Sequence, residues 1–394
     1  MEKQEKLWNE GYIKVMVANF ALYFAFYLLT PLLPLYLSEN FHATKDIIGL
    51  VLSGYTLTSL LSRPFSGYLV DSFPRKKVLM LCFFLFFVFF AGYLGAVSLL
   101  IFTIIRTIHG IPFGALTVSA STVAIDVLPS SRRNEGIGFY GLANNIAMAI
   151  APSAAIFIYK ATNSFEILFW LSLIVSFIGL LLAYTIKIPQ KEIVPNKSKL
   201  SLDRFFLVRG WLLAVNMVFF GFCFGVLSSY LAIYGKEVLH ITTGTGTYFT
   251  LLSVGLILSR LQGNKGLKEG RLTNNAAKGV LTSSVGYLLF VALPNDWGYY
   301  LSALLIGLGN GHMYPAFQNM FIQVAHHNER GTANSSILVA WDIGVGIGVV
   351  LGGFVAELFG YTPAFWMVAI AQFSGAILFL VATRTFFKKR RIIE

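Results

Sequence analysis

Long apolar stretches separated by short polar turns dominate the chain. They fall at residues 12–37, 47–70, 78–96, 98–126, 136–159, 165–186, 210–234, 246–263, 276–293, 297–323, 333–356 and 363–385. A helix needs about 20 mostly apolar residues to cross a bilayer, and the stretches have about that length. The pattern predicts an all-α integral membrane protein with twelve transmembrane helices. The first stretch is too long for a signal peptide and is followed by further spans, so we expect it to remain on the protein as a span.

A polar segment at 187–209 interrupts the chain near its midpoint, with two prolines and six basic residues. We predict that it is a cytoplasmic linker between an N-terminal six-helix bundle, residues 1–186, and a C-terminal one, residues 210–394. A shift of 197 residues, or one or two fewer, aligns the halves: Asn19 with Asn216, Ser62-Arg63 with Ser259-Arg260, Asn145 with Asp342, Phe169-Trp170 with Phe365-Trp366, and Gly136 with Gly331. The recurring shift predicts two pseudo-symmetric halves with a substrate site between them and alternating access by rocking.

Composition places this chain in a membrane, and the positions of its charges predict its orientation. Charged residues make up 12% of the 394 residues, about half the share of about 25% in soluble domains. If the N-terminus is cytoplasmic, 23 of the 30 basic residues fall in cytoplasmic segments and three in outer loops. The positive-inside rule then predicts two cytoplasmic termini in a bacterial-type cytoplasmic membrane. The net charge of +12 is explained by this orientation, so we expect no nucleic-acid partner.

The sequence offers no catalytic chemistry. The spans leave only short loops and no room for a soluble catalytic domain. Cys82 and Cys223 lie in apolar stretches with no Cys, His or acidic neighbour at metal spacing. No nucleophile–base set or phosphate loop is present. We expect a transporter without metal or cofactor, and we disfavour an enzyme or a channel because the two-fold repeat suits a rocking carrier.

Three motifs resemble those of the major facilitator superfamily. The segment GYLVDSFPRKK at 67–77 resembles its signature loop between the second and third spans, and RTIHG at 106–110 resembles its arginine motif, with His109 where glutamine is usual. In the fifth span, the spacing of the drug:proton antiporter branch is matched, with alanines replacing several glycines, by Gly138, Ala147, Ala151, Pro152 and Ala155. The resemblance covers the whole chain and implies the twelve-helix fold of two bundles.

The signature loop also suggests a conformational charge relay. Gly67 permits close helix approach, Asp71 can accept hydrogen bonds from the start of a facing helix, and Arg75 can bridge to a carboxylate. The resemblance implies that these residues and Asp126 form a relay that holds the two halves together when the cavity opens outward. The alternative is a solvated loop whose charges only fix topology. Lys268 stands where the repeat would place a second aspartate, which makes a relay in the second half doubtful.

Asp342 is the only carboxylate deep in a span, about 13 Å inside the eleventh. A charge there is costly, so a lone carboxylate is a functional candidate. It lies about 200° around the helix from a predicted packing ridge of Gly344, Gly348 and Gly352. Asn145 has the same relation to Ala147, Ala151 and Ala155. We expect Asp342 and Asn145 to face a central cavity where Asp342 carries a proton; the alternative is a structural aspartate held by hydrogen bonds.

Other polar residues and aromatics complete the candidate cavity. Arg106, about 12 Å into the fourth span, is a candidate to bind an anionic substrate group, to compete with the proton for Asp342, or to hold Asn145. His109 and His312 are candidate proton relays or packing residues. Aromatics in the first span of each half suit an apolar or planar substrate, or simply face lipid. The remaining cavity candidates are Asn19, Tyr23, Tyr27 and Asn216.

These features together predict a monomeric secondary transporter. We expect proton-coupled efflux of small amphiphilic compounds across the bilayer. The alternative is a proton-coupled importer of a sugar or another small nutrient. A cavity rich in polar hydrogen-bonding groups with paired aromatics would favour sugar uptake.

Overall fold

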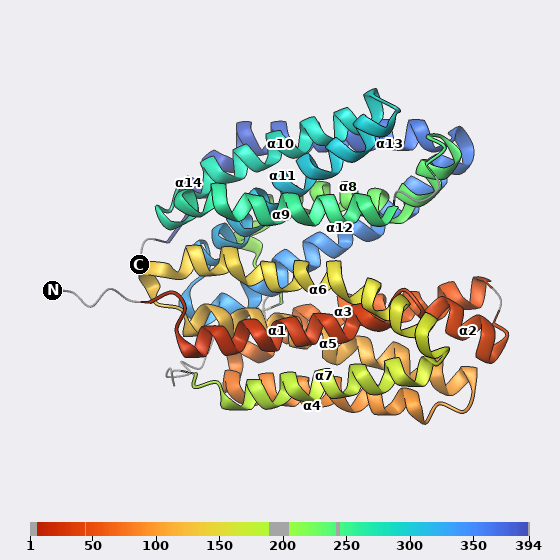
Figure 1. Ribbon diagram of the computed structural model, residues 1–394. Helices are drawn as coiled ribbons and strands as arrows, with labels where there is room; N and C mark the ends of the chain where they lie inside the picture. The colour runs from red at the N-terminus through yellow and green to blue at the C-terminus, as the bar shows by residue number, and fades with distance from the viewer. Residues whose placement is uncertain (1–5, 44, 189–204, 242–244, 393–394) are drawn as a thin grey trace. The chain divides into compact units, whose positions relative to one another are not determined.

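The computed structural model describes residues 6–43, 45–188, 205–241 and 245–392, and within these ranges it contains helices and no strand (Figure 1). The first half contains α1 (Glu10–Leu29), α2 (Leu33–Phe41), α3 (Lys45–Ser72), α4 (Arg75–Leu94), α5 (Leu99–Val127), α6 (Arg133–Thr162) and α7 (Phe165–Thr185). The second half contains α8 (Trp211–Glu237), α9 (Thr245–Lys268), α10 (Leu272–Ala292), α11 (Asp296–Gln323), α12 (Arg330–Phe359), α13 (Tyr361–Leu378) and α14 (Arg384–Arg390).

Each predicted apolar stretch contains most of one long helix, and the first stretch also contains part of the short helix α2. Leaving aside the short helices α2 and α14, the described chain has twelve α-helices of 18 residues or more. Eight helical segments are both long and apolar enough to cross a membrane by composition alone; the other four long helices are α3, α9, α10 and α11. The predicted all-α membrane fold is confirmed.

The first apolar stretch, 12–37, is broken rather than continuous. α1 ends at Leu29 and α2 begins at Leu33, with Pro31 between them and Pro34 in the first turn of α2. Two prolines three residues apart remove two backbone donors from adjacent turns, and Pro34 is well placed at a helix start. The backbone N–H and the hydroxyl of Thr30 both bond to Phe26 O, at 3.4 and 2.8 Å, and close the end of α1.

The chain divides into two compact units. Unit 1 comprises residues up to Gly136, Tyr140–Phe205 and Asn328–Ser335, and unit 2 comprises Ile137–Phe139, Phe206–His327 and residues from Ser336 onward. The main division falls inside the predicted linker at 187–209, of which residues 189–204 lie outside the described ranges. The first turn of α12 belongs to unit 1, whereas the rest of that helix belongs to unit 2.

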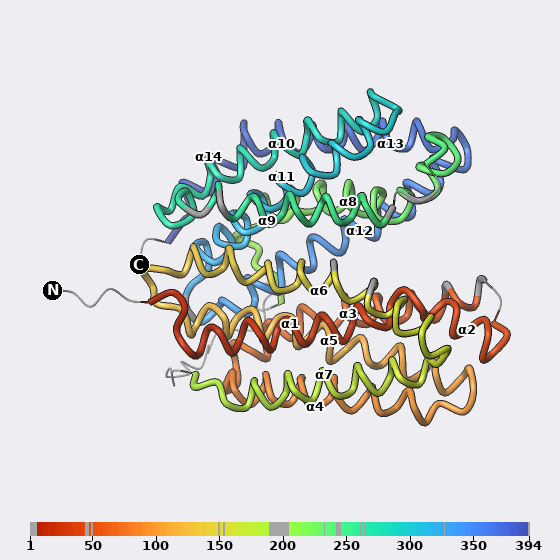
Figure 2. Tube along the Cα trace, in the orientation of Figure 1, coloured from red at the N-terminus to blue at the C-terminus, as the bar shows by residue number. Residues whose placement is uncertain are grey.

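The two units repeat one order of helix packing. In unit 1, α3 packs on α5, α5 on α4, α4 on α7, and α7 on α1. In unit 2, α9 packs on α11, α11 on α10, α10 on α13, and α13 on α8; Figure 2 traces the course of these helices. Glycines allow close approach at equivalent places: a methyl group on Gly114 would lie 2.5 Å from Ser59 O, and one on Gly311 would lie 2.7 Å from Ser259 Cβ.

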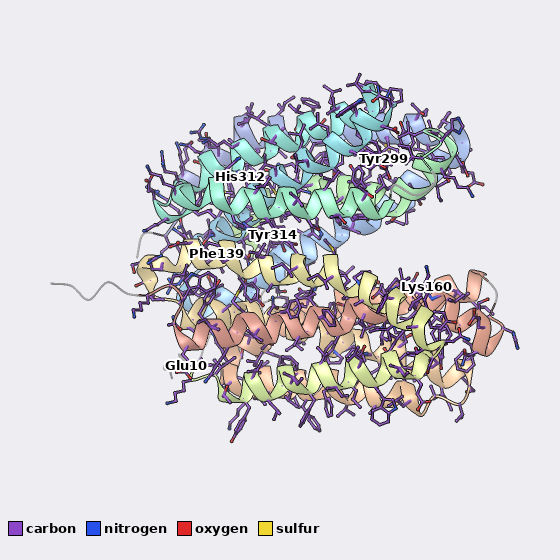
Figure 3. All side chains as sticks on the ribbon, in the orientation of Figure 1. Glu10, Phe139, Lys160, Tyr299, His312 and Tyr314 are labelled. Atoms are coloured by element: carbon purple, nitrogen blue, oxygen red, sulfur yellow. The ribbon has the colours of Figure 1, made fainter. Side chains whose placement is uncertain are left out.

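Polar contacts fix the ends of the helices in unit 1. Glu10 and Lys160 mark opposite ends of this bundle in Figure 3. At the end where α7 stops, Lys76 Nζ donates to the carbonyls of Ala183, Tyr184 and Ile186 at 2.6, 2.7 and 2.8 Å. The last carbonyls of a helix have no intrahelical partner and carry partial negative charge. Lys76 therefore caps α7 from the start of α4.

Candidate functional site

Asp71, Arg75 and Asp126 lie together in unit 1. Asp71 is in the last turn of α3, Arg75 begins α4, and Asp126 is in the last turn of α5. Arg75 Nη1 is paired with Asp126 Oδ2, and Arg75 Nη2 lies 3.5 Å from Asp71 Oδ1. One guanidinium thus bridges two carboxylates on neighbouring helix ends.

The Asp71 carboxylate also caps the first turn of α12, within unit 1. Its Oδ1 accepts from Gly331 N at 2.8 Å, and its Oδ2 accepts from Thr332 N at 2.8 Å and Thr332 Oγ1 at 3.0 Å. The first N–H groups of a helix have no intrahelical acceptor and carry partial positive charge, so a carboxylate suits this place. A methyl group on Gly67 would lie 2.8 Å from Ser335 Cβ and 3.0 Å from Gly331 O, which explains the glycine.

The start of α12 contributes residues that sequence reasoning missed. Arg330 Nη1 lies 3.9 Å from Asp126 Oδ1, Asn334 Nδ2 donates to Thr122 Oγ1 at 3.1 Å, and Ser335 Oγ donates to the carbonyl of Arg63 at 2.7 Å. The alignment of Gly136 with Gly331 marked this helix start in the sequence. It gave no sign of which helix faces it.

The corresponding place in unit 2 has different chemistry. A methyl group on Gly138 would lie 2.9 Å from Leu267 Cδ1, so an apolar side chain meets the start of α6. Lys268 is exposed, and the neighbouring carboxylate, Glu269, pairs with Arg271. The contact described here therefore contains no carboxylate comparable to Asp71.

The glycine ridge of α12 packs against α8 inside unit 2. Methyl groups on Gly344 and Gly352 would lie 2.9 Å from Phe222 N and Val226 Cγ2, and one on Gly348 would lie 3.0 Å from Phe222 C. Asp342 is half-buried and shares the other side of the helix with Gly346, because residues four apart lie on one face. A methyl group on Gly346 would meet no described atom within 4 Å.

The alanine ridge of α6 is fully buried, whereas Asn145 and Pro152 on the same helix are partly exposed. Ala147, Ala151 and Ala155 are each 0% exposed. Asn145 and Pro152 are half-buried, and Pro152 remains inside the helix. The buried alanines and half-buried Asn145 of α6 parallel the buried glycines and half-buried Asp342 of α12.

Arg106 and His109 on α5 lie in an aromatic cluster in unit 1. The Arg106 guanidinium carbon is 3.9 Å from the ring centre of Tyr55 on α3. Its Nη1 donates to Tyr93 Oη at 3.2 Å, and Tyr93 Oη lies 2.8 Å from Nδ1 of the fully buried His109. The Tyr93 hydroxyl thus connects Arg106 and His109. The hydrogen bond of Arg106 goes to Tyr93, not to Asn145.

The other candidate residues bond within their own units. Asn19 Oδ1 accepts from Tyr140 Oη at 2.8 Å, and the Tyr23 and Tyr27 rings stack at 6.1 Å. In unit 2, Asn216 Nδ2 donates to the carbonyl of Gly375 at 2.9 Å. His312, labelled on α11 in Figure 3, lies 3.1 Å from Asn275 Oδ1 through its Nδ1, and Asn275 Nδ2 donates to the His312 carbonyl at 3.1 Å. Asn216 and His312 thus connect neighbouring helices of one bundle.

Among the described residues, no group of three or more His, Cys, Asp or Glu side chains is placed to hold a metal ion. Cys82 and Cys223 are both buried free thiols.

A family profile, curated relatives and solved structures all match this chain over most of its length. The sequence profile of the Major Facilitator Superfamily matches residues 15–272 and 276–391. The staphylopine export protein of Staphylococcus aureus is 24% identical, with 88% of each chain covered. The uncharacterised MFS-type transporter YhhS of Escherichia coli is 26% identical over 92% of this chain and 91% of its own. The crystal structure of the transporter FucP in its outward conformation gives a TM-score of 0.79 at 18% identity, covering 98% of this chain and all of FucP.

Proposed function

The chain belongs to the major facilitator superfamily, and we propose that it is a proton-coupled exporter of small amphiphilic molecules that works by alternating access. It is a multi-pass membrane transporter rather than an enzyme. The proposal includes a bacterial cytoplasmic membrane, two cytoplasmic termini, a monomer, and two six-helix bundles, 1–186 and 210–394.

The position of Asp342 carries this proposal. Asp342 is the thirteenth of the 30 residues of α12, about 18 Å along a helix of about 45 Å. It lies on the side away from the glycines that pack on α8, and that side is open at Gly346. A carboxylate inside a bilayer is less costly neutral than charged. Asp342 can therefore take up a proton on one side of the membrane and release it where water reaches it on the other.

Two observations favour export over import. The Staphylococcus aureus relative, 24% identical, is named as an export protein. The fifth span has the antiporter-type spacing, and its three alanines form a buried ridge. The alternative is uptake of a sugar or another nutrient, and a measurement of the transport direction distinguishes it from export.

The Asp71 network supplies a second part of the proposal. Asp71 holds the first turn of the helix that carries Asp342, through two backbone N–H groups and one hydroxyl. Arg75 links Asp71 to Asp126, and Arg330 Nη1 lies 3.9 Å from Asp126 Oδ1. We assign the network to stabilising one conformation of the transport cycle, while Asp342 supplies the coupling.

Transport in proteoliposomes tests the coupling. The purified protein is reconstituted and an inward or outward pH gradient is imposed, with dyes, antibiotics and sugars as test substrates. The matched variants are Asp342→Asn and Glu357→Gln, because Glu357 is an exposed carboxylate on the same helix. We expect Asp342→Asn to abolish gradient-driven accumulation while substrate exchange without a gradient continues, and Glu357→Gln to behave like wild type.

Three results would contradict the proposal. Gradient-driven transport that is unchanged in Asp342→Asn removes Asp342 from coupling. Accumulation of a substrate in the same direction as the proton establishes import instead of export. A transport rate that does not change with the imposed pH gradient would show that transport is not coupled to protons.

A further inference from the structure

Arg106 is a buried cation in unit 1, and its contacts are to Tyr93, Tyr55 and Phe26. It is 4% exposed, and its guanidinium carbon lies 3.9 Å from the Tyr55 ring centre and 5.9 Å from that of Phe26 on α1. In the described part of the chain, no carboxylate forms an ion pair with it within 4.0 Å. Aromatic faces attract a cation but do not neutralise it, and a charge in the bilayer interior needs a partner.

The hydrogen bonds of the cluster supply no negative charge. Arg106 Nη1 donates to Tyr93 Oη, and Tyr93 Oη is hydrogen-bonded to Nδ1 of His109 at 2.8 Å. A tyrosine hydroxyl and an imidazole ring are not anions. Arg106, Tyr93 and His109 therefore keep the whole positive charge of the guanidinium.

Three buried polar atoms in this cluster make no hydrogen bond: Arg106 Nε, Tyr55 Oη and His109 Nε2. Tyr55 is 3% exposed. Buried polar groups are nearly always paired, so each such atom needs an explanation. Arginine can only donate and tyrosine can donate, so an acceptor next to Arg106 Nε and Tyr55 Oη would pair both of these atoms.

The free edge of the guanidinium has the geometry of a carboxylate site. The bond to Tyr93 uses Nη1, which leaves the edge formed by Nε and Nη2. Such an edge binds the two oxygens of a carboxylate through parallel, charge-assisted hydrogen bonds. The Tyr55 ring lies against the guanidinium face.

The aromatic rings around Arg106 determine which apolar group a ligand can carry beside its anionic group. Phe26 stacks on Phe113 at 4.6 Å and on Tyr55 at 5.4 Å, nearly parallel in both cases. Tyr23 meets the Phe113 ring edge-on at 6.0 Å. Phe26 and Tyr23 are only half-buried, so part of this aromatic wall remains open to a flat apolar group.

From these contacts we propose that the Arg106–Tyr55 cluster binds an organic carboxylate, with the carboxylate on Nε and Nη2 of Arg106 and on Tyr55 Oη, and with a flat apolar body along Phe26 and Tyr23. This narrows the amphiphilic substrates of the proposed function to organic anions and rests on that function. If Arg106 has only a packing role, the protein should bind an anion no more tightly than a matched neutral compound.

Matched acids and amides test the site directly. The probes are benzoate and indole-3-acetate, each compared with its neutral amide, benzamide and indole-3-acetamide. Binding to the purified wild-type protein in nanodiscs of neutral lipid is measured by calorimetry at neutral pH. We expect each acid to bind about tenfold or more tightly than its amide, the range of a hydrogen bond to a charged group.

Three variants locate the preference. Tyr55→Phe keeps the ring under Arg106 but removes the unpaired hydroxyl, and should weaken acid binding about 3- to 10-fold without changing amide binding. Arg106→Gln should abolish the preference for acids. Arg260→Gln removes another buried arginine of a long helix, one that donates to Gly311 O at 2.9 Å in unit 2, and should leave the preference unchanged. If Arg106→Gln does not fold, Tyr55→Phe alone decides.

The outcomes separate this inference from the proposed function. Equal binding of acid and amide by wild type, or an unchanged preference in Tyr55→Phe, overturns the carboxylate site, even if neutral amphiphiles are still exported by a pH gradient. A preference that depends on Arg106 and Tyr55 supports the site, even if no pH gradient drives transport and the exporter proposal fails.

Discussion

Replacing Asp71 with alanine should expose the first amides of α12 to solvent exchange. The amides of Gly331 and Thr332 are held by the Asp71 carboxylate at 2.8 Å. Helix geometry gives amides in this first turn no intrahelical acceptor. The Asp71→Ala variant therefore removes their protection and leaves the rest of α12 bonded.

The expected magnitude follows from the bond type. A hydrogen bond to a charged group contributes about 1.5–3 kcal/mol, and about 1.4 kcal/mol corresponds to a factor of ten. Exchange at Gly331 and Thr332 should therefore become about 10- to 100-fold faster. Thr332 Oγ1, the third donor to Asp71 at 3.0 Å, loses its acceptor as well, which favours the upper part of this range.

Hydrogen–deuterium exchange with mass spectrometry on the purified protein measures this effect. The start of α11 is an internal reference, since Gly298 N is capped by Asn295 Oδ1 at 2.9 Å and should not respond. Glu269→Ala is the control variant, because Glu269 is an exposed carboxylate paired with Arg271 after α9. Exchange at 331–332 that stays at the wild-type rate in Asp71→Ala, or rises equally in Glu269→Ala, would refute the reasoning.

Three further predictions concern packing and capping. Lys76→Met removes three hydrogen bonds to the last carbonyls of α7 and should cost about 1–3 kcal/mol, measured as a lower melting temperature, whereas Lys77→Met, at an exposed position, should not. Gly348→Leu forces a side chain against the α8 backbone at Phe222 and should lower the free energy of unfolding by about 1–3 kcal/mol or more. Gly346→Leu is the control, because a Cβ there meets no described atom within 4 Å. Equal melting temperatures for these two variants would contradict the packing. Gly67→Val places a side chain against Ser335 and Gly331, so it should raise exchange at 331–332 as Asp71→Ala does; unchanged exchange would mean that α3 and the start of α12 are not in contact.

Hydrophobic pattern was enough to predict the fold class and the number of long helices, because a bilayer requires a minimum apolar length. Pattern alone missed the break at Pro31, since whether a proline ends a helix or is tolerated depends on its surroundings. Pro64, Pro112, Pro152 and Pro315 all remain inside long helices.

The candidate site was predictable where its chemistry lies within one helix. The two faces of α12 follow from spacing alone, and the ridge does pack on α8. Partners from other helices were not predictable. Nothing in the sequence near Arg106 indicates that Tyr55 of α3 and Tyr93 of α4 will flank it, because tertiary packing brings them there.

The glycines between α8 and α12 have a mechanical consequence. Gly221 and Gly225 of α8 face the carbonyls of Trp341 and Val345, while Gly344 and Gly348 of α12 face those of Val218 and Phe222. Carbonyl groups of each helix thus lie over glycines of the other helix, at four-residue intervals. Sliding one helix past the other requires a jump of about one turn, 5.4 Å. The backbone of α12 at Asp342, two residues before Gly344, is therefore held in register with α8, and a shift of this segment along its axis should carry α8 with it.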